Sequence, residues 1–361
     1  MASLPVLDLP GIRKAYSIIR AQTYRTPVHE FPEMSRTVQD AVFGSDHDGH
    51  AGNSMLEVLF KCENMQKAGS FKFQGAYHFL SHLDEKSLRA GVVSYSTGNH
   101  AIALATAARS ISQIKGFPIP VHILMTWTAS QAKINAVRDL GATVLLHGPT
   151  LVECIQLANE MQLVTGATLV PQGHPIIALG QGTVMLELYE QMEELGHVTL
   201  DAIIIPSAGA GLLAGTAVVC RDSDSRTAVF GSEPTTGGAN LALARLQGKN
   251  ITILDGTTIA DGLRLTTALC TWHYVKDATL VQDVYQVADQ EIREALSLIA
   301  NQMNLVVEPS SAVPLAALLF SSDLQHALRA MYRGTPLRVG VVLTGGNISS
   351  DALRQLSYNE D

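Results

Sequence analysis

Lys72 is the residue whose neighbours in the sequence suggest covalent chemistry. It stands between Phe71 and Phe73, and apolar residues recur after it, over 76–83, with helical spacing. Ser70 is placed to cap that helix. Burial against aromatic rings disfavours the ammonium form of a lysine, and a neutral amine is what condensation with a carbonyl compound requires. Taken alone, this stretch more often indicates a solvated surface lysine, because lysines are rarely fully buried.

A second group of candidate residues follows an apolar strand expected at residues 92–95. The alanine-rich segment after this group, residues 101–109, predicts a helix. Hydroxyl, amide and free backbone N–H groups at the start of a helix suit a carboxylate, although the same residue types are also ordinary helix caps. We take the segment as a candidate substrate site, formed by Ser96, Thr97, Gly98, Asn99 and His100.

A loop of small residues, 206–215, joins another apolar strand to a helix. Small residues let the backbone approach an anion closely, and alanine permits this when its φ is negative. Gly209, Gly211 and Gly215, with Glu233 further along, also loosely resemble a dinucleotide fingerprint in which the third glycine is one residue out of place. This loop alone leaves a phosphorylated cofactor and a nicotinamide dinucleotide both open. Its candidate cofactor-binding residues are Ala208, Gly209, Ala210, Gly211 and Leu212.

Thr344 provides a third candidate site near the C-terminus. It follows the strongly apolar run 338–343 and precedes two glycines, Gly345 and Gly346. A hydroxyl at the end of a strand, beside flexible backbone, is able to reach a bound ring. By itself the segment is an ordinary turn, so its significance depends on the other loops.

The elements that must position these residues alternate between strands and helices. This alternation predicts an α/β fold with two lobes and mostly parallel twisted sheets. We expect a large domain formed by residues 1–90 and 167–361, and a small mobile domain formed by residues 91–166. The expected strands are at residues 56–61, 92–95, 121–125, 143–146, 168–170, 202–205, 228–231, 305–307 and 338–343.

The composition excludes several classes of protein. The chain has 361 residues, of which 47% are hydrophobic and 16% charged, which fits a well-buried globular enzyme. The formal net charge of −8 and the absence of a basic cluster argue against nucleic acid as a partner. No apolar run is long enough for a membrane span, and no signal peptide is evident, so we expect a soluble cytoplasmic protein.

Two observations argue against a bound metal. The four cysteines are scattered, without a Cys-x-x-Cys pair, which indicates reduced thiols. The polar loop at residues 44–53 contains Asp46, His47, Asp48 and His50 but lacks the spacing and distal glutamate of a calcium loop. We expect no metal site in this chain.

In this order, the segments resemble the pyridoxal-phosphate-dependent enzymes of the tryptophan-synthase β fold type (fold type II), particularly the serine/threonine dehydratase and serine racemase branch. Several motifs in register are more specific than any one alone. Besides the loops above, the resemblance includes Thr26-Pro27, Lys61 to Glu63, Gly180 to Thr183, Ala260 to Gly262, Glu308 to Ser310 and Asn347.

The resemblance implies a role for each candidate residue. Lys72 carries pyridoxal 5′-phosphate as a Schiff base, Phe71 packs near the cofactor, and Asn99 hydrogen-bonds its phenolic oxygen. The loop 208–211 holds the phosphate, and Thr344 faces the pyridine nitrogen. A neutral hydroxyl cannot keep that nitrogen protonated as a carboxylate can, so the ring is a weaker electron sink and prompt loss of a β-substituent is favoured over a long-lived carbanion.

We therefore expect elimination of water from a β-hydroxy amino acid such as serine or threonine. The freed Lys72 amine removes the Cα proton, the β-hydroxyl leaves, and hydrolysis of the released product gives a 2-oxo acid and ammonia. A nicotinamide oxidoreductase leaves Lys72 and Thr344 without a role. A non-catalytic cofactor-binding or carrier protein stays open.

Several departures from the family pattern keep other reactions open. The racemase branch has a serine as a second acid/base, and Thr97 stands at that position with a stiffer, methylated side chain. Amino-acid racemisation or epimerisation and β-replacement are the alternatives. Glu233-Pro234 matches part of that branch's divalent-cation site, but residues 235–240 supply no second carboxylate. The basic residue expected near 149–153 for a substrate carboxylate is missing. Relatives of this kind are commonly homodimers, which we also expect here.

Overall fold

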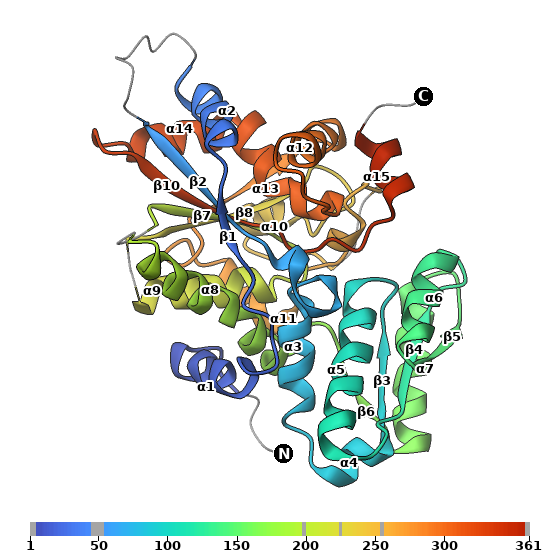
Figure 1. The fold of residues 1–361 in the computed structure, drawn as a ribbon. Coiled ribbons are helices and arrows are strands. Elements are labelled where there is room, and N and C mark those ends of the chain that lie inside the picture. The colour runs from blue at the N-terminus through green and yellow to red at the C-terminus, as the bar shows by residue number, and fades with distance from the viewer. Residues whose placement is uncertain (1–4, 45–53, 197–199, 224–225, 253–255, 358–361) are drawn as a thin grey trace.

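Two β-sheets organise the chain in a computed structural model that describes residues 5–44, 54–196, 200–223, 226–252 and 256–357. One sheet has six strands in the order β1-β2-β10-β7-β8-β9, and the other has four in the order β5-β4-β3-β6 (Figure 1). All neighbouring strands are parallel except β1 and β2. The predicted α/β fold with mostly parallel sheets is confirmed.

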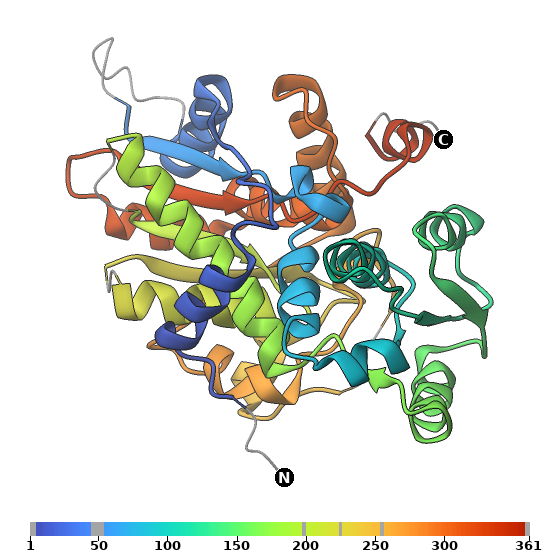
Figure 2. The same ribbon diagram turned by 60° about the horizontal axis from the view of Figure 1, so that its bottom comes forward.

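The six-stranded sheet lies between two layers of helices (Figures 1 and 2). Helices α2, α12, α13 and α14 cover one face, while α1, α8 and α9 cover the other. Because both faces are covered, central strands such as β7 are buried along their whole length. The strands are β1 Val28–Glu30, β2 Leu56–Lys61, β7 Ala202–Pro206, β8 Ala228–Pro234, β9 Asp283–Val287 and β10 Leu337–Val342. The helices are α1 Leu9–Ile19, α2 Pro32–Phe43, α8 Pro175–Glu194, α9 Gly211–Ser223, α10 Leu241–Gln247, α11 Leu269–Val275, α12 Asp289–Gln302, α13 Pro309–Phe320, α14 Ser322–Met331 and α15 Ser350–Ser357.

The four-stranded sheet lies to one side of the larger sheet (Figure 1). Its core includes side chains of α3 and α5 as well as its own strands. The strands are β3 Val92–Tyr95, β4 Val121–Met125, β5 Thr143–Leu146 and β6 Thr168–Leu169. The helices around it are α3 Lys72–Leu80, α4 Glu85–Ala90, α5 Asn99–Lys115, α6 Gln131–Asp139 and α7 Leu151–Thr165, and the 3₁₀ turns of the chain are η1 Glu63–Met65, η2 Lys67–Gly69 and η3 Asp261–Leu263. The division into a large domain and a mobile small domain stays a prediction.

Helix α3, which begins at Lys72, packs directly on α8. A Cβ atom added to Gly180 of α8 would lie 2.6 Å from the carbonyl oxygen of Gln74, so only glycine allows this approach. Phe73, Ala76 and Leu80 are buried on α3, as the helical spacing predicts. The start of the helix is therefore held rigidly against the larger body.

Several details of the predicted elements are wrong. Residues 305–307 form no strand, because they lead into Pro309 at the first turn of α13 and lie outside both sheets. Strand β9 was not expected, because its two exposed polar residues, Asp283 and Gln286, interrupt the apolar pattern. Ser70 does not cap α3: the N-cap position is Phe71, and the buried Ser70 hydroxyl has no partner among the described residues.

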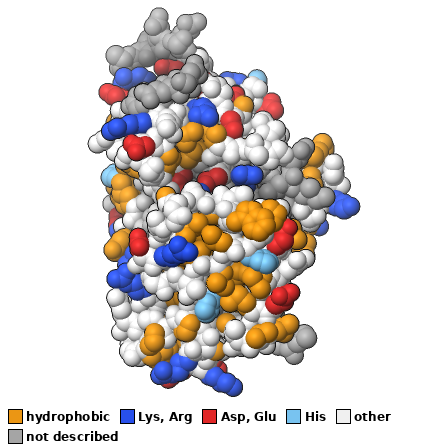
Figure 3. Space-filling view, turned by 90° about the vertical axis from the view of Figure 1, so that its right-hand side faces the viewer, with side chains coloured by type: hydrophobic (Ala, Val, Ile, Leu, Met, Phe, Trp, Pro, Cys, Tyr) orange, Lys and Arg blue, Asp and Glu red, His pale blue; other side chains and the backbone are white. Residues whose placement is uncertain are grey.

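Positive and negative side chains are interspersed on the face shown in Figure 3, and hydrophobic side chains gather on its middle and lower parts. In the described ranges, no helix has both the length and the apolar character needed to cross a membrane, and no group of three or more His, Cys, Asp or Glu side chains is arranged to hold a metal. Residues 45–53 of the polar loop lie outside the described part of the chain.

Candidate active site

A cavity of about 640 Å³ opens at the carboxyl ends of strands from both sheets. Segments that follow β3, β4, β7 and β10 all contribute to its lining, which is where parallel α/β sheets bind ligands. The structure places every candidate site residue from the sequence around this one cavity: Phe71, Lys72, Ser96, Thr97, Gly98, Asn99, His100, Ala208, Gly209, Ala210, Gly211, Leu212 and Thr344.

Lys72 is the first residue of α3 and lines the cavity. Its Nζ lies 5.2 Å from the centroid of the Phe71 ring. Burial lowers the pKa of Lys72 to about 8, and the negative charge of Glu308 opposes part of that shift. A neutral amine is therefore accessible close to neutral pH, as nucleophilic attack on a carbonyl requires.

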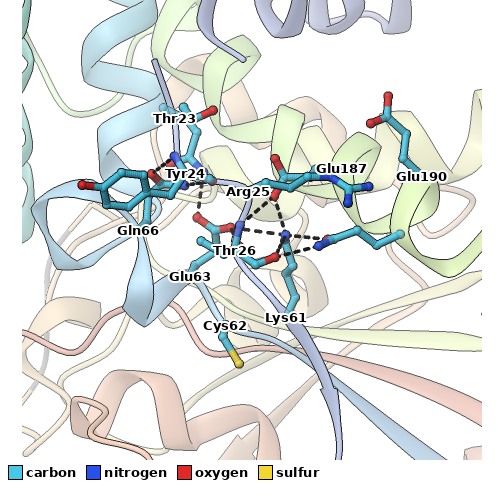
Figure 4. A network of polar contacts seen from close by, with 12 residues as sticks. Thr23, Tyr24, Arg25, Thr26, Lys61, Cys62, Glu63, Gln66, Glu187 and Glu190 are labelled. Carbon is cyan, nitrogen blue, oxygen red and sulfur yellow. Dashed lines mark hydrogen bonds and ion pairs between the residues drawn. The ribbon is translucent and has the colours of Figure 1, made fainter. Parts of the chain in front are cut away.

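A buried polar network, of which Figure 4 shows Thr26, Lys61, Glu63 and Glu187, contacts α3 through Gln74. Gln74 donates a 2.7 Å hydrogen bond to Oε2 of Glu63, whose Oε1 accepts from the hydroxyl of Thr26 at 2.6 Å. Lys61 lies beside them and donates to Oε1 of Glu187 at 2.5 Å. Burial raises the pKa of Glu187, and the charge of Lys61 opposes this effect. The network connects α3, β2 and α8, so it restricts the position of Lys72.

The loop between β3 and α5 presents unused backbone donors. The N–H groups of Thr97, Asn99 and His100 donate to no other residue in the described ranges. Gly98 is the N-cap residue of α5. Its backbone N–H donates to Oγ of Ser96 at 3.3 Å. Free N–H groups at a helix N-terminus form an anion site, so the geometry fits a carboxylate.

His100 is neutral in this loop. Its Nε2 faces the carbonyl oxygen of Val170 at 3.3 Å, and a carbonyl only accepts, so Nε2 carries the hydrogen and Nδ1 is free to accept. Burial lowers the pKa of His100 to about 3, and the nearby positive charge of Lys72 lowers it further. The imidazole is consequently no proton donor at neutral pH.

The loop after β7 forms a second set of free donors. The N–H groups of residues 208–212 donate to no other described residue, and α9 begins within this loop at Gly211. Ala210 has φ of +61°, so the expectation of a negative φ at this alanine is wrong. A left-handed residue among right-handed ones turns successive N–H groups toward one point, which is the geometry of an anion nest. An alanine there costs about 1–2 kcal/mol, a strain typical of binding sites.

Thr344 faces the cavity with a hydroxyl neighbour. Its Oγ1 lies 3.1 Å from Oγ of Ser311, which also accepts from the backbone N–H of Gly345 at 2.8 Å. Thr344 is 6% exposed and Ser311 is fully buried. Both groups are uncharged at all ordinary pH values, so this end of the cavity offers a hydrogen bond without a formal charge.

These residues fit pyridoxal 5′-phosphate. An amine with a lowered pKa suits its aldehyde, and the nest at residues 208–212 suits its phosphate. A hydroxyl at Thr344 suits its ring nitrogen. The buried Ser207 hydroxyl, immediately before the nest, has no partner among the described residues. The volume accommodates the cofactor together with a small substrate.

Several charged residues around this cavity have no role predicted from the sequence. Glu308 accepts a 2.6 Å hydrogen bond from Nδ2 of Asn99. Lys133 of α6 forms an ion pair with Asp261 of η3, which joins the two sides of the cavity, and Arg264 also lines it. Asp261 and Glu308 lie within segments that carry the family resemblance, and that was the only signal for them.

Glu233, which matches part of the divalent-cation site of the racemase branch, accepts hydrogen bonds from the backbone N–H groups of Leu241 and Ala242, at the start of α10.

Comparisons with known proteins agree with these features. The family model described as "Pyridoxal-phosphate dependent enzyme" matches residues 20–345. A serine racemase of Oryza sativa subsp. indica is 34% identical over 352 residues, which cover 97% of this chain and 94% of that protein. An L-threo-3-hydroxyaspartate ammonia-lyase of Pseudomonas sp is 35% identical over 302 residues, covering 83% of this chain and 88% of that protein. The solved structure of maize serine racemase superimposes with a TM-score of 0.82 at 33% identity, covering 98% of this chain and 97% of the maize chain.

Proposed function

Because this chain belongs to the pyridoxal-phosphate-dependent enzymes and uses pyridoxal 5′-phosphate with an amino-acid substrate, we propose that it eliminates water from a β-hydroxy amino acid. The products are a 2-oxo acid and ammonia. The observation that carries this proposal is the uncharged pair of hydroxyls at Thr344 and Ser311. When bound, pyridoxal phosphate withdraws electrons from the substrate Cα, and it does so less strongly when its ring nitrogen meets a hydroxyl instead of a carboxylate. Weak withdrawal favours immediate loss of a β-substituent.

Lys72 is the proposed base. Its pKa of about 8 leaves a useful fraction of neutral amine at neutral pH, and its position at the rigid start of α3 keeps Nζ inside the cavity. The amine takes the proton from Cα, the electron pair of the broken C–H bond forms the Cα–Cβ double bond, and the β-hydroxyl leaves as water with the proton that Lys72 has taken. Hydrolysis of the released unsaturated amine gives the 2-oxo acid and ammonia.

The loop at residues 96–100 is the proposed site of the substrate α-carboxylate, because its unused N–H groups and the N-terminus of α5 attract an anion. Two further cations, Lys133 and Arg264, line the same cavity. Cations of this kind suit a second carboxylate on the substrate, so a 3-hydroxyaspartate has to be included among the substrates tested. The name of the Pseudomonas relative supports the same choice.

Racemisation is the second candidate reaction. Thr97 lines the cavity together with Lys72 and carries a hydroxyl able to move a proton. The rice and maize relatives named as serine racemases support this alternative. Racemisation needs proton transfer on both faces of Cα, so it depends on Thr97, whereas elimination needs only Lys72.

The test is product analysis with the purified holoenzyme. Serine, threonine and the isomers of 3-hydroxyaspartate are each supplied, and ammonia, 2-oxo acid and the opposite enantiomer are measured. Release of ammonia and 2-oxo acid in equal amounts supports elimination, and solvent deuterium at Cα of both enantiomers without ammonia contradicts it. Thr97→Ala separates the reactions, because it abolishes racemisation and leaves elimination largely intact. Thr97→Ser, which keeps the hydroxyl, is the matched control for Thr97→Ala.

A further inference from the structure

Three side-chain hydrogen bonds connect the segment before Lys72 to the far wall of the cavity. Nδ2 of Asn347 donates to the carbonyl oxygen of Ala68 at 2.8 Å and to Oδ1 of Asn99 at 2.8 Å. Nδ2 of Asn99 then donates to Oε2 of Glu308 at 2.6 Å. We call this series, Ala68–Asn347–Asn99–Glu308, the amide relay.

The orientation of the Asn347 and Asn99 side-chain amides follows from the two groups at the ends of the relay, the Ala68 carbonyl and the Glu308 carboxyl. The Ala68 carbonyl only accepts, so the atom of Asn347 that faces it must be the nitrogen. The second hydrogen of that nitrogen then points to an acceptor, which fixes Oδ1 of Asn99 on the Asn347 side. The Asn99 nitrogen must therefore face Glu308. Glu308 uses one of the two Asn99 N–H hydrogens, and one remains for the cavity that Asn99 lines.

The local backbone holds both ends of the relay in place. Ala68 and Gly69 have φ of +62° and +65°, and a Cβ on Gly69 would collide with the Asn347 amide. The N–H of Glu308 donates to the carbonyl oxygen of Gly345 at 2.9 Å, and the Glu308 side chain is only 7% exposed. A Cβ on Gly345 would collide with the Glu308 carboxyl, so no space is left for Glu308 to turn away.

We propose that Glu308 is a positioning residue that, through the amide relay, aims the free N–H of Asn99 at the phenolic oxygen of the bound cofactor. The inference rests on the proposed contact between Asn99 and the cofactor, but not on which reaction follows. An ionised Glu308 accepts a stronger, charge-assisted hydrogen bond from Asn99 and so holds the Asn99 amide more firmly in its orientation. A neutral Glu308 accepts a weaker hydrogen bond and holds the amide less firmly.

The charge of Glu308 changes close to neutral pH. Burial raises its pKa to about 7, the Asn99 hydrogen bond lowers it, and the charge of Asp261 raises it while Lys133 and Lys72 lower it. Because the raised pKa belongs to an acid, Glu308 is neutral below about pH 7 and ionised above it. The visible absorption of the bound cofactor should therefore change with pH in this range.

The test compares the holoenzyme with Glu308→Gln, which keeps an acceptor oxygen and removes the charge. We expect the cofactor absorption of the variant to lose its change near pH 7, and cofactor dissociation to increase about five- to tenfold above that pH. Glu294→Gln, an exposed glutamate of α12, is the matched control and should behave as the parent. These readouts need no substrate, so they stand even if the proposed reaction is wrong.

Asn347→Asp provides an independent test if Glu308→Gln folds poorly. The two side chains have the same shape, but a carboxylate cannot donate to the Ala68 carbonyl or to Asn99. We expect it to shift the cofactor absorption at every pH and to weaken cofactor binding about tenfold or more. The proposal is overturned if both variants retain the parent's absorption, pH response and cofactor affinity.

Discussion

Gln74, which lies two residues after Lys72 on α3, donates a 2.7 Å hydrogen bond to Oε2 of Glu63. Gln74 is 4% exposed and Glu63 is fully buried, so the bond is shielded from water. The Oε1 atom of Gln74 has no partner among the described residues. The interaction is therefore a single, directional attachment between the helix that carries Lys72 and η1, the turn that follows β2.

The first prediction concerns Gln74→Glu, which replaces this donor by a second carboxyl group. Two carboxyl groups at this distance cannot both be ionised, so the introduced group is forced to hold a proton in the folded state. A raised folded-state pKa gives stability that is present at low pH and lost as pH rises. We expect the variant to resemble the parent near pH 4, below the unfolded pKa of a glutamate, and to be less stable by about 1–3 kcal/mol near pH 8.

Denaturant unfolding at the two pH values measures this effect. Gln74→Leu is the matched control, because it removes the bond without adding an acid and should lower the stability equally at both pH values. A stability difference of Gln74→Glu that does not change with pH would contradict the buried contact with Glu63.

The second prediction concerns Lys61, whose side chain is fully buried near the carboxyl groups of Glu187 and Glu63, 2.5 and 3.9 Å away. Removing one partner of a buried ion pair leaves an uncompensated charge. We expect Lys61→Met to reduce the free energy of unfolding by about 3–5 kcal/mol. The double variant Lys61→Met with Glu187→Gln should recover part of that loss.

An exposed ion pair supplies the control for this measurement. Arg89 and Glu85 form a pair at 2.8 Å on α4, with both side chains more than half exposed. Arg89→Met should change the stability far less, because solvent screens an exposed pair. Equal losses in Lys61→Met and Arg89→Met would show that the buried network adds no special stability.

The positions of the candidate residues in the chain were predictable, whereas their mutual contacts were not. Asn99 and Thr344 each come shortly after an apolar strand, and Lys72 precedes an apolar helix, a pattern that the sequence displays. The parallel sheets then bring the ends of their strands to one cavity. Local patterns of this kind predict where helices and strands begin and end. The α/β topology then predicts that the ends of the strands meet at one site.

The amide relay could not be predicted from local sequence patterns. Asn99 and Glu308 are separated by 209 residues, and their 2.6 Å contact depends on how both lobes pack. Nothing in the types of the neighbouring residues distinguishes this glutamate from a solvated one. The left-handed Ala210 was equally hidden, because alanine normally avoids a positive φ and only the surrounding structure imposes it.

The third prediction tests the strain at Ala210. Glycine adopts a φ of +61° without a steric penalty, but it also gains freedom in the unfolded chain. We expect Ala210→Gly to stabilise the protein by up to about 1 kcal/mol. Ala214→Gly, one turn into α9, is the control: it should destabilise by about 1 kcal/mol or more, since it adds a helical glycine and removes a buried methyl group. Thermal unfolding of the two apo-proteins gives the sign, and a destabilised Ala210→Gly would contradict the left-handed geometry.

The final prediction concerns the pH dependence of cofactor attachment at Lys72. Burial lowers the pKa of this lysine from 10.5 to about 8, and only the neutral amine attacks an aldehyde. The neutral fraction then rises about fivefold between pH 7 and pH 8 and less than twofold between pH 8 and pH 9. We expect the rate constant for association of pyridoxal phosphate with the apo-protein to follow this curve, measured by the appearance of the visible band. A simple alkyl amine treated with the same cofactor corrects for titration of the cofactor itself, and Lys72→Ala should give no band. An ordinary lysine predicts a tenfold increase for each pH unit through pH 9, so that result would show that Lys72 is a solvated amine.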